Sequence, residues 1–252
     1  MNYIEGSYPG GASACPETLR QYFDDGTIDG YERILSEGKE AVVHVVSKSG
    51  AVKRYYAAKV YKKREERAFK NRADYLVTQN LFKRRELLAV QKKSRFGKTV
   101  EEAIWQIRET VYLKELFAAG ADVPAVVKAG QNSFVMEYLG EGEERALKLV
   151  EAKSEIRDPG GLFARVMRNV ELFLRCNIVH GDLSPYNVLY HRGRVVVIDF
   201  PQASDPRRNP NAQALLLRDI RNICAFFARW NVPADPEALY TELWNKYRLN
   251  EI

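Results

Sequence analysis

Cysteine is scarce in this chain: only Cys15, Cys176 and Cys224 occur among 252 residues. They lie far apart in the sequence, and no two of them have the C-x-x-C spacing of a zinc or redox motif. A disulfide-stapled fold or a cysteine-based metal site would need clustered cysteines. We therefore expect reduced thiols and a cytoplasmic protein.

Long apolar runs are also missing. No stretch approaches the ~20 apolar residues that a transmembrane helix requires, and residues 1–6 lack the basic-then-apolar pattern of a signal peptide. The sequence thus predicts a protein without a membrane partner. Its hydrophobic content of 46% is ordinary for a folded protein, and 252 residues suffice for one large or one two-lobed domain.

Acidic residues are sparse in one segment. Between Lys62 and Lys98 there are 13 Lys or Arg residues against 4 Asp or Glu, so this segment alone exceeds the net charge of +6 of the whole chain. A basic segment of this kind attracts phosphate groups, nucleic acid or an acidic protein surface. The alternative is a mobile, solvated insertion without a partner. A helix is expected within it, around residues 65–75.

The first part of the chain has the residue patterns of β-strands. Residues 1–30 are rich in Gly, Pro, Ser and Asp, and we expect an N-terminal extension there, packed on the main body or partly loose, with a short helix at residues 17–23. β-Branched and alternating runs then predict five strands. These strands are expected at residues 31–36, 41–46, 54–61, 125–129 and 133–138.

Helical patterns dominate the rest. Apolar residues at helical spacing predict helices over residues 100–118, 160–176, 212–229 and 236–247. Gly120 ends the first helix, and Asp235 followed by Pro236 is a typical helix start. Residues 178–200 alternate short strands and turns. The sequence therefore predicts an α+β fold of two lobes. The N-lobe (about 31–138) holds an antiparallel sheet and one helix, the hinge lies at 137–140, and a reduced, helical C-lobe covers about 141–252.

One stretch carries polar residues in a pattern typical of phosphoryl transfer. His180, Asp182 and Asn187 form an H-x-D-x-x-x-x-N motif, and Asp199 follows a β-branched run twelve residues later. Such chemistry needs a carboxylate to orient or deprotonate the attacking hydroxyl and oxygen ligands that hold Mg²⁺ on the phosphates. Asp182 suits the first role, and Asn187 with Asp199 the second. The alternative is that both aspartates cap turns and His180 is a core histidine.

A lysine on the third strand suits phosphate binding. Lys59 lies in Tyr-Ala-Ala-Lys-Val, two residues after Ala57, and a strand lysine at this place would contact nucleotide phosphates. Its partner should be a glutamate on the following helix, either Glu109 or Glu115. The connection between the first two strands, Ser-Glu-Gly-Lys-Glu-Ala at residues 36–41, could cover the phosphates with a backbone amide and a cation.

These segments together resemble the RIO family of atypical serine/threonine protein kinases, in a short form without a winged helix. The resemblance covers about residues 31–230. SEGKEA at 36–41 is similar to the family's STGKEA, and AKVYK follows at 58–62. HGDLSPYNVLYH at 180–191 is close to HADLSEYNMLYH, and IDFPQA at 198–203 is close to IDxxQ.

The resemblance implies a two-lobed protein-kinase-like fold with ATP held between the lobes and a flexible insertion at residues 62–98. It implies that Asp182 is the catalytic acid or base, that Asn187 and Asp199 bind Mg²⁺ or Mn²⁺, and that Lys59 pairs with Glu109. The metal-loop Asp of this family can itself accept phosphate, which would allow ATPase turnover. The remaining nucleotide-binding residues that it implies are Ser36, Gly38, Lys39, Val43, Ala57, Met136, Glu137, Leu139 and Leu189.

Three functions stay open at this point. The first is a RIO-like protein kinase or ATPase that acts on a protein or on itself, with Ser94 and Thr99 as candidate acceptors. The second is a small-molecule phosphotransferase of the aminoglycoside or choline kind, since HGDLxPxN with IDF is typical of those enzymes. The third is an ATP-liganded binding protein that holds ribosomal RNA or an acidic partner through residues 62–98.

Overall fold

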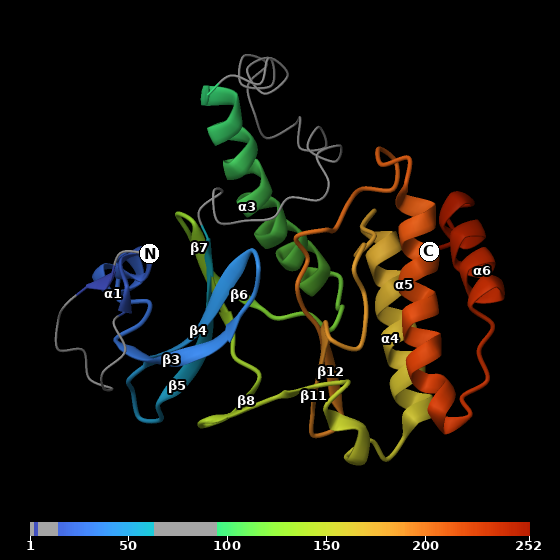
Figure 1. Ribbon diagram of the computed structural model, residues 1–252, viewed down its shortest axis with the longest axis horizontal. Helices are drawn as coiled ribbons and strands as arrows, with labels where there is room; N and C mark the ends of the chain where they lie inside the picture. Colours follow the sequence, from blue (N-terminus) through green and yellow to red (C-terminus); the bar gives the residue numbers. More distant parts are fainter. Residues whose placement is uncertain (1–2, 5–14, 63–94) are drawn as a thin grey trace. The chain divides into compact units, whose positions relative to one another are not determined.

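The computed structural model describes residues 3–4, 15–62 and 95–252, and for residues 3–4 and 95–106 only the backbone. The chain falls into two units (Figure 1). The first comprises the described residues up to Thr110 together with Ala125–Tyr138. The second comprises Val111–Pro124 and Leu139–Ile252. The chain passes between the units after Thr110, after Pro124 and after Tyr138, and the last of these passages lies inside the predicted hinge at residues 137–140.

The first unit is built on a five-stranded antiparallel sheet in the order β3-β4-β5-β7-β6. Its strands are β3 (Gly30–Glu37), β4 (Ala41–Lys48), β5 (Arg54–Tyr61), β6 (Val126–Gly130) and β7 (Ser133–Glu137). The Val- and Tyr-rich segments of β4 and β5 favour this structure because β-branched and aromatic side chains fit a pleated surface. All five predicted strands are confirmed, each within a residue or two of its expected bounds.

The strand register decides which side chains share a face of this sheet. Val43 pairs with Lys59, Val45 with Ala57, and Ala57 in turn with Met136. Directly paired residues of an antiparallel sheet project to the same side. Four of the predicted nucleotide-binding residues, Val43, Ala57, Lys59 and Met136, therefore lie on one face.

The N-terminal segment covers the opposite face. A two-stranded ribbon joins β1 (Tyr3–Ile4) to β2 (Cys15–Pro16), and a 3-10 turn leads into α1 (Arg20–Asp24). The Tyr22 hydroxyl hydrogen bonds to Ser133 Oγ over 3.0 Å. The buried side chains of this cluster are Cys15, Leu19, Tyr22, Ile28 and Tyr31 from the N-terminal side and Val46, Ala58, Val60 and Val135 from the sheet. The described part of the predicted extension thus packs on the main body, and its short helix is confirmed.

Helix α3 (Arg95–Ala118) is longer than predicted. It begins five residues before the expected start at residue 100, so the predicted insertion 62–98 is wrong at its end. Residues 95–98 belong to the predicted basic segment, and Gly97 among them does not prevent a helix, because a single glycine costs a helix only about 1 kcal/mol. Gly120, with φ +79°, ends the helix as predicted. The helix expected at 65–75 and the candidate acceptor Ser94 lie outside the described residues, as do 63–94 generally.

The second unit contains a small sheet in the order β10-β11-β12 and a hairpin. The sheet strands are β10 (Leu147–Lys148), β11 (Val188–His191) and β12 (Arg194–Val197), and the hairpin strands are β8 (Gly140–Glu141) and β9 (Glu144–Arg145). β11 and β12 confirm the short strands expected before residue 200. The two-residue strands β8, β9 and β10 were not predicted, because so short a segment carries no periodicity.

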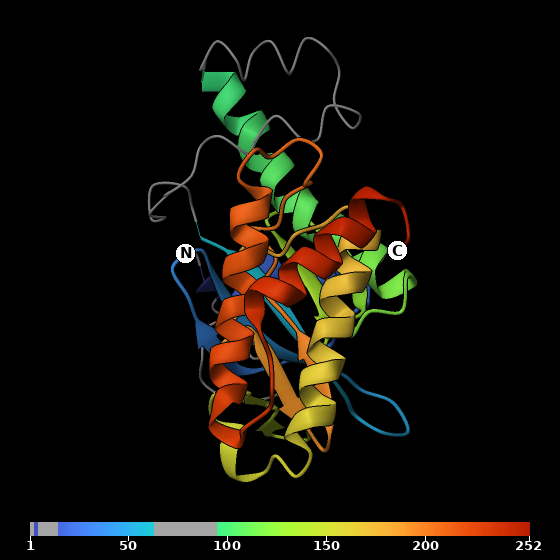
Figure 2. The same ribbon diagram turned by 90° about the vertical axis from the view of Figure 1, so that its right-hand side faces the viewer.

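Three helices accompany this sheet, and they lie side by side in Figures 1 and 2. They are α4 (Pro159–Arg175), α5 (Ala212–Phe227) and α6 (Pro236–Arg248), all predicted. Asp158 caps α4 by accepting from Gly161 N, and Asp235 caps α6 by accepting from Glu237 N and Ala238 N. Of the described helices, none has both the length and the apolar character that crossing a lipid bilayer requires.

Candidate active site

His180 anchors the loop that carries the predicted catalytic residues. Its side chain is buried, and Nε2 lies 3.1 Å from the Ile198 carbonyl oxygen. Nδ1 lies 3.2 Å from the Asp182 backbone N–H, which donates to it. The imidazole is therefore the Nε2–H tautomer, because a carbonyl can only accept and a backbone N–H only donates. His180 joins the start of the loop to the end of β12.

Asp182 and Asn187 close this loop on each other. Asn187 Nδ2 donates to the Asp182 carbonyl oxygen at 2.9 Å and to Asp182 Oδ2 at 3.3 Å. The Asn187 carbonyl oxygen accepts from Ile198 N at 2.9 Å, which ties the loop to β12. With both amide hydrogens of Asn187 directed at Asp182, its Oδ1 is the atom that can face a metal ion. The Asp182 side chain is exposed to solvent.

Asp199 adopts a backbone conformation that aspartate seldom takes. Its φ is +71°, in the left-handed region, and it follows directly after β12 and Ile198. Such a conformation costs roughly 1–3 kcal/mol and persists only where neighbours impose it. The next residue, Phe200, is fully buried, with ring centroids 5.4 Å from Phe173 and 4.5 Å from His180. This packing holds the backbone while the Asp199 carboxylate stays exposed.

The two carboxylates are close enough to repel each other. Desolvation by the surrounding protein raises the pKa of Asp182, and the charge of Asp199 raises it further. Arg218 and the hydrogen bond from Asn187 act in the opposite direction. A divalent cation between such groups would offset the repulsion. The donor set also fits Mg²⁺, which takes oxygen ligands and shares them with substrate phosphates. In the described part of the chain, no group of three or more His, Cys, Asp or Glu side chains is placed to hold a metal by itself.

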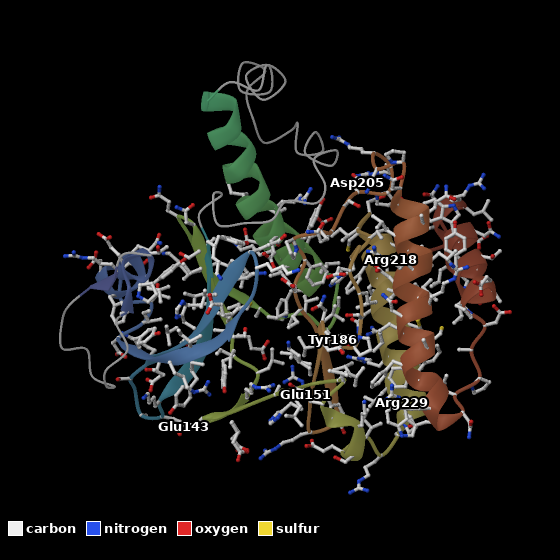
Figure 3. All side chains as sticks on the ribbon, viewed as in Figure 1. Glu143, Glu151, Tyr186, Asp205, Arg218 and Arg229 are labelled. Atoms are coloured by element: carbon white, nitrogen blue, oxygen red, sulfur yellow. The ribbon has the colours of Figure 1, made fainter. Side chains whose placement is uncertain are left out.

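Side chains of helix α5 hold the backbone of this loop by hydrogen bonds. The buried Asp219 accepts from the backbone N–H groups of Gly181 (2.8 Å) and Leu183 (3.0 Å), on either side of Asp182. Arg218, labelled in Figure 3, donates to the Gly181 carbonyl, and Asn222 Nδ2 donates to the Leu183 carbonyl at 3.0 Å. Burial raises the pKa of Asp219 to about 7, against the effect of the two backbone hydrogen bonds.

Sequence reasoning gave Asp219 no role. Its signal was a lone carboxylate on the apolar face of a helix, between Leu216 and Ile220, where a charged residue is buried only if it is bonded. Gly181 is fixed for a related reason. Its φ is +77°, and a Cβ there would lie 2.7 Å from the Gln202 carbonyl oxygen. Only glycine fits this position without strain.

In the first unit, the structure pairs Lys59 with Glu109. Lys59 Nζ donates to Glu109 Oε1 at 2.7 Å, and both side chains are buried. Glu109 Oε2 accepts from the Tyr61 hydroxyl, also at 2.7 Å. Tyr61 was missed from the sequence, although it lies two residues after Lys59 and so on the same face of β5. Glu115, the other candidate partner, lies in the second unit. Its pKa is raised by burial, with Arg207 lowering it and Asp205 raising it.

The connection between β3 and β4 is a tight turn. Gly38 N donates to the Ala41 carbonyl at 2.9 Å, and Ser36, Gly38 and Lys39 are exposed. Lys62, at the start of the basic segment, forms a 2.6 Å ion pair with Glu37 in this connection. The turn therefore presents the hydroxyl group of Ser36 and the ammonium group of Lys39 to solvent, while the Gly38 amide is used within the turn.

The residues predicted around adenine are mostly half-buried. Ala57 is buried and Val43 and Met136 are half-buried in the first unit, and Leu189 is half-buried on β11 in the second. At the predicted hinge, Glu137 N donates to the Ala125 carbonyl in the first unit, and the Leu139 carbonyl accepts from Ala146 N in the second (both 2.8 Å). These bonds fix the backbone on each side of the predicted hinge.

Residues 41–239 match the family model of the RIO domain. The chain belongs to the RIO family. It is 34% identical over 216 residues to the RIO-type serine/threonine-protein kinase Rio1 of Haloferax volcanii, covering 86% of this chain and 69% of that protein. It is 33% identical to the serine/threonine-protein kinase rio1 of Schizosaccharomyces pombe, covering 84% of this chain but 41% of that protein.

The solved RIO structures share the fold. The Rio2 kinase–ADP/Mg²⁺–phosphoaspartate complex from Chaetomium thermophilum superimposes with a TM-score of 0.63 at 19% identity, over 90% of this chain and 64% of that one. The resemblance to the RIO family and the α+β, protein-kinase-like fold inferred from the sequence are thus confirmed. The chain spans about two fifths of the length of the yeast relative and two thirds of the archaeal one.

Proposed function

We propose that this RIO-family chain is an ATP- and Mg²⁺-dependent phosphotransferase, a RIO-type serine/threonine protein kinase or ATPase. The observation that carries the proposal is the Asp182–Asn187 hydrogen-bonded pair beside the exposed carboxylate of Asp199. Its relatives are named serine/threonine-protein kinases, and the Rio2 structure from Chaetomium thermophilum holds ADP and Mg²⁺.

In the second unit, Asp182 is proposed to orient the attacking hydroxyl and to accept its proton. Its pKa, raised by desolvation and by the charge of Asp199, makes it a stronger base than an ordinary aspartate. Asn187 Oδ1 and the Asp199 carboxylate are proposed to hold Mg²⁺ or Mn²⁺. When bound, the cation neutralises charge on the phosphates. The hydrogen bonds from α5 to Gly181 and Leu183 hold Asp182 in place between them.

In the first unit, Lys59 is proposed to bind the α- and β-phosphates, with Glu109 and Tyr61 holding its ammonium group in position. The turn residues Ser36, Gly38 and Lys39 cover the phosphates. The proposed adenine-binding residues of the two units are Val43, Ala57, Met136, Glu137, Leu139 and Leu189. Residues 31–252 would form the kinase domain, with residues 1–30 as an extension.

ATPase turnover would proceed through Asp199. One of its carboxylate oxygens attacks the γ-phosphorus, the bond to the bridging oxygen breaks, and ADP leaves with that electron pair. Water then attacks the phosphorus of the acyl phosphate, Asp182 accepts its proton, and Asp199 is released with inorganic phosphate. The phosphoaspartate named in the Chaetomium Rio2 structure motivates this route.

Partners and compartment belong to the same proposal. The acceptor would be a protein or the chain itself, with Thr99 on α3 as one candidate. The basic segment 62–98 would dock ribosomal RNA or an acidic surface, although of its members only Lys62 and residues 95–98 are described. All three cysteines are free thiols, which supports a cytoplasmic protein. The alternatives remain a small-molecule phosphotransferase and an ATP-liganded RNA-binding protein.

The test is incubation with labelled ATP and Mg²⁺, followed by separation of phosphoprotein, phosphorylated small molecules and free phosphate. Asp182→Asn should keep most of the ATP affinity and lose turnover by a factor on the order of 10² or more. Asp199→Ala should abolish the gain in nucleotide affinity that Mg²⁺ provides. Asp235→Asn is the matched control, because asparagine also caps the α6 N-terminus. Turnover of Asp182→Asn close to that of this control would refute the catalytic assignment.

A further inference from the structure

The linker after helix α3 touches the strand that leads to Asp199. Within the second unit, the Asp122 carbonyl oxygen accepts a 2.8 Å hydrogen bond from Val197 N, the last residue of β12. β12 is an outer strand of its sheet, so this bond lies on the edge that no strand of the described chain covers. Asp199 follows only two residues later. A linker far away in sequence thus fixes the end of the strand that presents the proposed metal ligand.

Asn169 and Arg165 of α4 hold Asp122 in place. Asn169 Oδ1 accepts from Asp122 N at 2.6 Å, and Asn169 Nδ2 donates to Asp122 Oδ2 at 2.8 Å. Arg165 grips both carboxylate oxygens with a forked pair of bonds, Nη2 to Oδ1 at 2.6 Å and Nε to Oδ2. Partial burial of Asp122 opposes ionisation, but these bonds lower its pKa below the usual value. Backbone and side chain of Asp122 are therefore both fixed.

Asn169 distinguishes the network around Asp122 from an ordinary surface ion pair between Asp122 and Arg165. It is fully buried on α4 between Val166 and Val170, where an apolar side chain would cost nothing to bury. Its Nδ2 also donates to the Arg165 carbonyl at 2.9 Å, so oxygen and nitrogen both have partners. A buried amide is tolerated only in a bonded arrangement of this kind. Its amide makes two bonds to Asp122, one to the backbone and one to the carboxylate.

The backbone conformation of Asp199 depends on the residues before it, one of which is bonded to Asp122. Its φ of +71° must be imposed from outside, and three hydrogen bonds fix the two residues before it. Two of them, Ile198 N to the Asn187 carbonyl and His180 Nε2 to the Ile198 carbonyl, lie within the segment 180–199 itself. Of the three bonds, only that from Val197 N to the Asp122 carbonyl connects this segment to a residue outside it.

We propose that Asp122, held by Asn169 and Arg165, is a positioning residue that sets the place of the Asp199 carboxylate for metal binding. The inference deepens the proposed function and rests on it, because it assigns how the metal ligand is presented. Partners of metal ligands commonly change metal affinity about 10- to 100-fold when they are removed. Asp122 acts through two residues of backbone, so the lower end of that range is expected.

The experiment measures ADP affinity by calorimetry with and without Mg²⁺, in the full chain. Asp122→Asn and Asn169→Asp should each reduce the Mg²⁺-dependent gain about tenfold and leave metal-free ADP affinity within about twofold. Arg165→Ala should weaken it less, and Arg175→Ala, which removes the same charge from an exposed site on the same helix, should not change it. Amide hydrogen exchange at Val197 should accelerate in the first two variants without any nucleotide.

A double variant that exchanges the two side chains provides the most specific test. In D122N/N169D an amide and a carboxylate again face each other, so most of the lost Mg²⁺-dependent gain should return. If both single variants keep the full Mg²⁺-dependent gain in ADP affinity of the wild-type protein, the positioning role is overturned, whether or not exchange at Val197 becomes faster. A wild-type protein that shows no gain from Mg²⁺ at all would instead refute the proposed function. Thermal unfolding identifies a variant that does not fold. If Asn169→Asp does not fold, the Mg²⁺-dependent gain of the near-isosteric Asp122→Asn variant decides the test.

Discussion

Replacing Tyr61 with phenylalanine removes a single oxygen atom from the first unit. That oxygen donates a 2.7 Å hydrogen bond to Glu109 Oε2, while Oε1 binds Lys59 at the same distance. Tyr61 and Glu109 are 6% and 3% exposed, so water cannot replace the lost donor. A hydrogen bond to a charged group contributes about 1.5–3 kcal/mol, and burial places this one towards the upper end. We expect Tyr61→Phe to lower the free energy of unfolding by roughly that amount.

The assay is urea unfolding, combined with a double-mutant cycle. Glu109→Gln alone should cost about 3–5 kcal/mol, because it leaves the Lys59 ammonium buried without a counter-charge. In that background Tyr61→Phe should have little further effect, and the difference gives the coupling energy. ATP affinity should fall as well, at about tenfold for each 1.4 kcal/mol lost from the bound state.

Tyr56 provides the control. It lies on the same strand, on the opposite face, and is partly buried against the N-terminal cluster. Tyr56→Phe should therefore stay within about 0.5 kcal/mol of wild type, like most substitutions that remove no buried contact. Equal unfolding free energies for Tyr61→Phe and Tyr56→Phe would show that the Tyr61 hydroxyl does not support the ion pair.

Three further outcomes are expected. Gly181→Ala should cost roughly 1–3 kcal/mol in thermal unfolding, because its Cβ would lie 2.7 Å from the Gln202 carbonyl at φ +77°; an unchanged melting temperature would refute the strain argument. Burial raises the pKa of Asp219 to about 7, so the unfolded chain loses this proton first as pH rises. Stability should then fall between about pH 4 and pH 7, by about 1.4 kcal/mol per unit of pKa difference, and Asp219→Asn should remove that slope in urea titrations. Burial lowers the pKa of His44 to about 4, and its Nε2 has no hydrogen-bond partner among the residues that the structure describes. The unfolded chain therefore takes up this proton first as pH falls, so stability should decline from about pH 6.5 to 4; a His44→Leu variant with the same decline would contradict this.

The sheet of the first unit was predictable because its strands carry their own signal. The β-branched run of β4 and the alternating residues of β5 identify strands without reference to partners. The two-residue strands β8 to β10 could not be found, since they exist only through the segments with which they pair. The start of α3 was misplaced because the basic charge of residues 95–98 suggested a loop.

The candidate site divides in the same way. Asp182, Asn187 and Asp199 were recognised by spacing along one short segment. Asp219 and Asn169 support that segment from helices whose sequences look like ordinary amphipathic patterns, and their roles appear only once backbone groups are placed beside them. Spacing rules detect groups that act on a ligand together, but not groups whose partners are main-chain atoms of another element.

The strand order of the first unit also has a consequence for how the chain is made. β5 pairs with β7, so Lys59 meets Phe134 as a neighbour although 75 positions separate them. During synthesis β3, β4 and β5 emerge first, and β5 then presents an open edge with the apolar sequence Tyr-Tyr-Ala-Ala-Lys-Val-Tyr. An unpaired edge of this kind is a template for association with other chains. A nascent chain therefore exposes this edge after Tyr61 has left the ribosome and until Ser133–Glu137 has followed it.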